Sequence, residues 1–66
     1  MAFRQQRKLL FKLGALEVTK YGDNFRIKVR YGIDTNKLKR SFHIERLKNE
    51  YDTKFDHYLV SYKGDS

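Results

Sequence analysis

One segment of this 66-residue chain has a basic residue at every second position, and these residues are the best placed to do chemistry. Arg26, Lys28 and Arg30 alternate with apolar residues through residues 25–31, FRIKVRY. Strict alternation of this kind predicts a β-strand with one buried face and one exposed face. Like charges side by side on a sheet repel one another, so a face of this composition favours a polyanion as its partner. The pattern predicts a phosphate-binding surface.

The segment 37–44 is expected to form the adjacent strand and to add Lys37 and Lys39 to the same face. Tyr21, in an expected strand over 15–21, is the aromatic side chain expected on the exposed face of the sheet. The other aromatic residues of the expected strands fall on the face that should be buried. Single strands read on a sheet usually need exposed aromatics for base stacking, so this distribution favours duplex DNA over RNA. Arginine would read guanine, and lysines with a basic N-terminal helix would hold phosphates. The predicted nucleic-acid-binding residues are Arg26, Lys28, Arg30, Lys37, Lys39, Tyr21, Arg4, Arg7 and Lys8.

Other chemistry has weaker support. His43 follows Ser41 at outward parity and could act as a general base, which leaves a small ribonuclease as an alternative. Asp52 and Asp56 lie one helical turn apart and could bind a hard cation, but an acidic helix face explains them equally well. His57 is expected on the solvated side of the last helix. With no cysteine in the chain, a thiolate zinc site is excluded, and we expect no enzyme, no metal and no cofactor.

Hydrophobic periodicity predicts the elements that position these residues. Residues 3–13 predict a short helix that ends at Gly14. Strands are expected over 15–21, 25–31 and 37–44. Residues 44–62 fit a C-terminal helix, because their apolar residues fall within about 120° of arc. The β propensity of YLVSY leaves a fourth strand at 55–62 open as the alternative.

The predicted fold class is therefore α+β. A three-stranded antiparallel sheet packs on a C-terminal helix, with a short N-terminal helix, in the order αβββα. The cations point away from the core only if the sheet packs in this way, because the apolar side chains of each strand must then face the helix. The expected core is Leu16, Val18, Phe25, Ile27, Val29, Leu38, Phe42, Ile44, Leu47, Tyr51, Phe55, Tyr58 and Leu59.

This order is similar in layout to the arm-type DNA-binding domains of tyrosine integrases, which lay a three-stranded sheet in the major groove. The full αβββα order also resembles a double-stranded-RNA-binding domain. That family implies a lysine-rich motif at the start of the last helix, where this chain has the mixed-charge stretch IERLK at 44–48. Both likenesses imply a duplex partner.

Composition agrees with a polyanionic partner. The net charge is +7, and it is uneven: residues 1–44 carry 11 basic and three acidic residues, whereas 45–62 carry three basic and four acidic ones. The length predicts one domain over 1–66. The sequence lacks an apolar run of membrane-spanning length and a secretory leader pattern, so the cytoplasm is the expected location.

The predicted function is a duplex-DNA-binding accessory protein, of the size found in phages or mobile elements. The alternatives are a small inhibitor or adaptor that docks on an acidic protein surface, and a duplex-RNA binder or ribonuclease.

Overall fold

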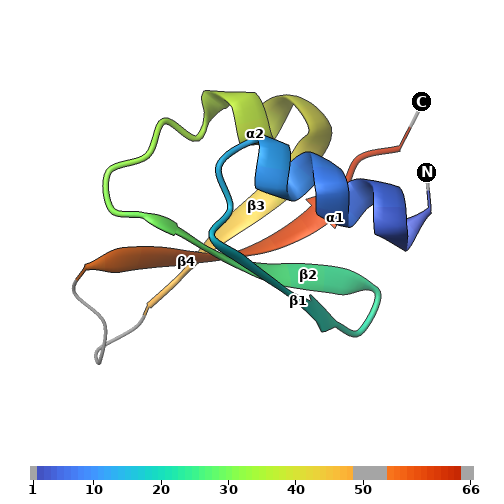
Figure 1. The fold of residues 1–66 in the computed structure, drawn as a ribbon, viewed down its shortest axis with the longest axis horizontal. Helices are drawn as coiled ribbons and strands as arrows, with labels where there is room; N and C mark the ends of the chain where they lie inside the picture. Colours follow the sequence, from blue (N-terminus) through green and yellow to red (C-terminus); the bar gives the residue numbers. More distant parts are fainter. Residues whose placement is uncertain (1, 49–53, 65–66) are drawn as a thin grey trace.

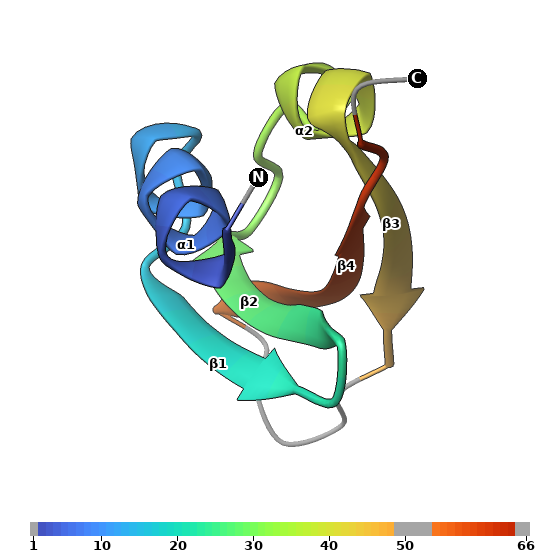
Figure 2. The same ribbon diagram turned by 90° about the vertical axis from the view of Figure 1, so that its right-hand side faces the viewer.

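The computed structural model describes residues 2–48 and 54–64 and shows two helices and four strands in them (Figure 1). The elements follow one another along the chain as α1 (Phe3–Lys12), β1 (Glu17–Tyr21), β2 (Asn24–Arg30), α2 (Asn36–Ser41), β3 (Phe42–Leu47) and β4 (Phe55–Tyr62). The strands form one sheet in the order β1-β2-β4-β3, and every neighbouring pair is antiparallel. Both helices lie on the same side of this sheet (Figures 1 and 2).

The N-terminal half agrees with the sequence-based expectation. The predicted helix forms, and Gly14 follows its C-cap Leu13 with a φ of 115°. β1 and β2 are joined by the Gly22–Asp23 turn, and Val18 pairs with Ile27 on the inward side. Phe25, Ile27 and Val29 are all buried, as the alternation over 25–31 predicts.

The C-terminal half corrects the predicted fold class. The expected C-terminal helix over 44–62 is wrong: its described residues form β3 and β4, and the sheet has four strands. The alternative of a strand at 55–62 is confirmed, with β4 spanning Phe55–Tyr62. The likenesses to integrase arm domains and double-stranded-RNA-binding domains rested on a terminal helix, so they carry no further weight.

The expected strand over 37–44 is also wrong, because most of that segment forms α2. β2 and β3 are each antiparallel to β4, so they run parallel to each other with β4 between them. Joining parallel strands requires a crossover over one face of the sheet, and a helix is the usual solution. α2 makes this crossover and buries Leu38 against the sheet. The asparagine that begins α2, Asn36, donates its backbone N–H to Asp34 Oδ1 at 3.0 Å.

The core lies between the sheet and the two helices. Its buried apolar residues are Leu10, Ala15, Phe25, Ile27, Val29, Leu38, Phe42, Tyr58 and Val60. α1 contributes Leu10, and its Phe3 ring meets the Phe25 ring edge to face at 5.8 Å between centroids. Val60 is fully buried although the sequence reading left it out of the core. Leu16, which the sequence placed in the core, is 51% exposed.

Three other expected core residues lie elsewhere. Leu47, Phe55 and Leu59 are half-buried and project from the side of the sheet that faces away from the helices. Tyr51 lies outside the described residues. Because these apolar side chains do not join the main core, they belong to a separate surface of the molecule.

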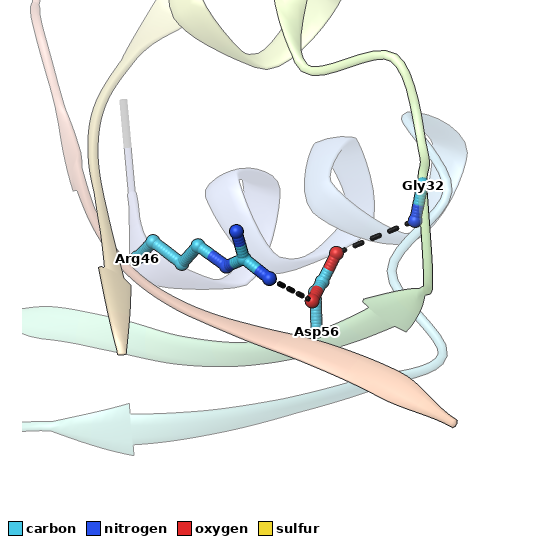
Figure 3. A network of polar contacts seen from close by, with 3 residues as sticks. All are labelled: Gly32, Arg46 and Asp56. Carbon is cyan, nitrogen blue, oxygen red and sulfur yellow. Dashed lines mark hydrogen bonds and ion pairs between the residues drawn. The ribbon is translucent and has the colours of Figure 1, made fainter. Parts of the chain in front are cut away.

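A polar network links β3, β4 and the loop that follows β2 (Figure 3). Asp56 of β4 has a side chain only 11% exposed, and its Oδ1 accepts a hydrogen bond from Arg46 Nη2 of β3 at 3.1 Å. Its Oδ2 accepts a longer bond from the Gly32 backbone N–H at 3.4 Å. The carboxylate thus ties β3, β4 and the loop after β2 to one another. The predicted role of Asp56 in an acidic helix face is therefore wrong, and its expected helical neighbour Asp52 lies outside the described residues.

Candidate functional site

The side of the sheet turned away from both helices is the candidate site, and we call it the outer face (Figures 1 and 2). Among the described residues, no helix covers it. Paired residues in the antiparallel register share a face, and neighbours along a strand alternate. The register therefore assigns these residues to the outer face: Glu17, Thr19, Tyr21, Asn24, Arg26, Lys28, Arg30, His43, Glu45, Leu47, Phe55, His57, Leu59 and Ser61.

The cations of β2 run along the middle of the outer face. Arg26 and Arg30 are exposed, and neither has an ion pair within the part of the chain that the structure describes. Lys28 is engaged with two neighbours: its Nζ lies 3.6 Å from Glu17 Oε2 and 4.3 Å from the centroid of the Phe55 ring. Cations on this strand thus differ in how freely they can meet a ligand, and the two arginines are the more available ones.

Rows of side chains cross the outer face from β1 to β3, and two of these rows end in a carboxylate at one edge. One row contains Thr19, Arg26, Leu59 and Glu45. The next row, two residues further along each strand, contains Glu17, Lys28, His57 and Leu47. The basic residues lie on a central strand, whereas Glu17 and Glu45 lie on the two edge strands. The Arg and Lys residues that the register assigns to this face therefore all lie along β2, and we call Arg26, Lys28 and Arg30 the β2 track.

Described residues of the outer face line two hollows that share Arg26. One, of about 360 Å³, is lined by Tyr21, Arg26, Leu47, Lys48 and Leu59. The other, of about 210 Å³, is lined by Glu17, Thr19, Arg26, Ile27, Lys28 and His57. The larger hollow combines an aromatic ring and two aliphatic side chains with two cations. This composition suits a ligand that has both a flat apolar part and a negative charge.

The structure separates the predicted nucleic-acid-binding residues into two groups on opposite sides of the sheet. Tyr21, Arg26, Lys28 and Arg30 lie together on the outer face. Lys37 and Lys39 belong to α2 on the other side, so the expected row of five cations on two adjacent strands is wrong. The remaining predicted residues, all on α1 and exposed, are Arg4, Arg7 and Lys8.

The helices form a second basic surface, which we call the helix layer. Neither α1 nor α2 contains an acidic residue. Its exposed cations are Arg4, Arg7, Lys8, Lys12, Lys37, Lys39 and Arg40. The Arg7 guanidinium lies 5.8 Å from the centroid of the exposed Phe11 ring. The excess charge of residues 1–44 is therefore divided between two surfaces, because β4 is inserted between β2 and β3.

Both histidines lie on the outer face. His43 pairs with Ser61, and His57 pairs with Lys28 and lines the smaller hollow. The expected position of His57 on the solvated side of a helix is wrong, since it is a half-buried residue of β4.

Sequence reasoning missed the apolar members of this face, which are Leu47, Phe55 and Leu59. The signal that could have found two of them was the alternative strand at 55–62, whose alternation puts Phe55, His57 and Leu59 on one side. Leu47 depended on β3, which starts five residues later than the strand expected there.

In the described ranges 2–48 and 54–64, no helix is long and apolar enough to cross a membrane, and no group of three side chains of metal-ligand type gathers. Comparison of the chain with protein-family models, with curated proteins and with solved structures gave no match.

Proposed function

We propose that this protein binds nucleic acid through the outer face of its sheet. The observation that carries the proposal is the position of the β2 cations beside apolar side chains on a face left open by both helices. Arg26 and Arg30 offer charge for phosphates, and Tyr21 with Leu59 offers apolar surface for bases. Proteins that bind nucleic acid strands combine these two features, a cationic groove and side chains that stack on bases.

The helix layer supports the same function at longer range. Its seven exposed cations raise the positive potential around the whole domain, and such a field accelerates the encounter with a polyanion. Contacts to phosphate alone carry no information about bases. We therefore assign the helix layer to attraction and the outer face to the bound complex.

The charge pattern disfavours a second copy of the chain as the occupant of the outer face. A two-fold interface places the same patch of each subunit against its copy. With the two-fold axis through the β2 track, the cations of the two copies would be brought together, and Glu17 and Glu45 are the acidic residues that the register offers on this face to compensate. A polyanion meets no such repulsion from the track itself.

Charge reversal on the two sides of the sheet tests the proposal. The double variant Arg26→Glu/Arg30→Glu removes the free cations of the outer face, and the control Lys37→Glu/Lys39→Glu makes the same change in net charge on α2. Binding to labelled oligonucleotides is measured by fluorescence anisotropy at about 50 mM salt, with circular dichroism to confirm folding. We expect at least a tenfold larger Kd for the first variant and at most about a threefold increase for the control.

Equal losses in both variants would show that net charge alone governs binding, and a larger loss in the α2 control would assign the interface to the helices. Either result contradicts the proposal. Poly-glutamate as a competitor separates nucleic acid from an acidic protein surface. We expect it to displace the oligonucleotide only at a large excess, because it has no bases to place in the hollows.

A further inference from the structure

We infer that the outer face accepts a single strand of DNA or RNA, with its phosphates along β2 and one base in the hollow between Tyr21, Leu47 and Leu59. This inference rests on the proposed function and names its substrate. It reverses the preference for duplex that the sequence indicated, because the tertiary structure changes both observations behind that preference.

The first observation is the number of cations on the outer face. The duplex reading required five cations on two adjacent strands, and Lys37 and Lys39 lie on the helix side. Three cations remain, all on β2, with Glu17 on the adjacent edge strand β1 and Glu45 on the other edge strand, β3, beyond β4. A duplex presents two phosphate backbones, so its second backbone would have to pass close to an edge carboxylate. A single strand places only one backbone along the track, where the neighbouring acid, Glu17, is already paired with Lys28.

The second observation is the amount of apolar surface on the outer face. The sequence reading gave the outer face one aromatic residue, whereas the structure adds the ring of Phe55 and the side chains of Leu47 and Leu59. The Phe55 ring is covered by Lys28, so Tyr21, at 65% exposure, is the aromatic ring offered to a ligand. Bases of a duplex are stacked on one another and their flat faces are not accessible without unpairing. Bases of a single strand are free to stack on such a ring.

The hollow beside Tyr21 fits a base with its phosphate. Leu47, Leu59 and the ring of Tyr21 supply its apolar lining, and Arg26 and Lys48 complete the lining with positive charge. Its volume of about 360 Å³ lies in the range of small-ligand sites. Because Arg26 lines both hollows, a phosphate bound there would direct the flanking nucleotides to either side of it.

The length of the track predicts a short binding site. Arg26 to Arg30 spans four residue steps of β-strand, which is about 13 Å. At about 3.4 Å per stacked nucleotide, this distance corresponds to roughly four nucleotides. An oligonucleotide of about twelve nucleotides therefore covers the track with room at both ends.

The experiment compares one twelve-nucleotide sequence, end-labelled, as single-stranded DNA, as single-stranded RNA and as the corresponding duplexes. We expect at least one single strand to bind at least about tenfold more tightly than its own duplex by fluorescence anisotropy. Tyr21→Leu should weaken single-strand binding at least about fivefold, because stacking on the ring is lost, and Tyr21→Phe should stay within about twofold. The matched control is Tyr31→Leu: Tyr31 is 64% exposed but lies beyond the end of β2 and outside the outer face. Its Kd should not change.

The outcomes distinguish a failure of this inference from a failure of the proposed function on which it rests. Duplex binding as tight as single-strand binding, with loss of both in Arg26→Glu/Arg30→Glu, overturns the single-strand inference and leaves the proposed function standing. An unchanged Kd in a folded Tyr21→Leu variant overturns the assignment of the base to the hollow. Failure of every nucleic acid to bind the unmodified protein overturns both proposals.

Discussion

The Lys28 ammonium lies 4.3 Å from the centroid of the Phe55 ring, in contact across the strand pair β2–β4. The same ammonium is 3.6 Å from the carboxylate of Glu17 on β1. Lys28 thus sits between an aromatic neighbour and an acidic one at the middle of the outer face. Its ammonium lies over an aromatic ring and its charge is partly balanced by Glu17, so it contributes to the surface in a different way from the arginines two residues before and after it.

This contact predicts a graded effect of removing single cations. Lys28→Met keeps a long apolar stem over Phe55 and removes a charge that Glu17 already balances in part, so oligonucleotide Kd should rise by at most about twofold. Arg26→Met removes a cation without an ion pair in the described structure, and Kd should rise at least about fivefold. Anisotropy titrations at one salt concentration compare the two. The reverse order would mean that Lys28 leaves Glu17 and becomes the main phosphate contact.

Salt dependence reports how many phosphates are neutralised. Three cations on β2, with Lys48 beside the larger hollow, predict a slope of log K against log salt of about −2 to −3 for a single strand. Neutralisation of five or six phosphates of a duplex would give a slope of about −5 instead. Titrations between 50 and 300 mM potassium chloride distinguish these values. A slope of about −5 or steeper would mean that the helix layer takes part in the bound complex.

The Arg46–Asp56 pair should stabilise the fold measurably. Asp56 is nearly buried and ties β3 to β4, so a double-mutant cycle with Arg46→Ala and Asp56→Ala should give a coupling free energy of about 1 kcal/mol. Each kcal/mol corresponds to about 4–8 °C in Tm for a domain of this size.

The matched comparison is the Glu17–Lys28 pair on the outer face. Glu17 has a side chain 68% exposed, and the two charges are 3.6 Å apart, so its cycle should give about 0–0.5 kcal/mol. Chemical denaturation provides the seven free energies of unfolding that the two cycles require, because both start from the same unmodified protein. A coupling as small in the first cycle as in the second would show that the Arg46–Asp56 network does not contribute to stability.

Gly14 should resist substitution more strongly than Gly22. Gly14 has a φ of 115°, which is much further from the left-handed helical region at about 57° than the φ of Gly22, and a Cβ built there would also require the Cδ1 end of the Ile33 side chain, 2.8 Å away, to shift. Gly22 has a φ of 62° with open space around it, so Gly22→Ala meets only the backbone cost of about 1–2 kcal/mol. Thermal melts should show the larger loss of Tm for Gly14→Ala. Equal losses would indicate that Ile33 moves aside without cost.

The sequence by itself determined the elements that depend on local residue spacing or on pairing between consecutive segments. α1 has a stripe of apolar residues at helical spacing that ends at a glycine, and β2 alternates strictly between apolar and basic residues. A one-residue shift in β2 would expose its whole apolar set, so its register and its outward cations follow from the pattern alone. Tyr21 and the three β2 cations were identified correctly as one surface for the same reason.

The tertiary structure decided where the C-terminal half goes. β4 lies between β2 and β3 and is covered by helices on one face only, yet its outer face still carries Phe55 and Leu59. Apolar residues on both faces give the continuous run Tyr58-Leu59-Val60, in which a period of two and a helical period cannot be told apart. The same insertion forces the parallel crossover through α2, and it carries Lys37 and Lys39 away from the outer face. Long-range strand pairing, which local periodicity does not encode, therefore set both the narrow basic track and the apolar hollows beside it.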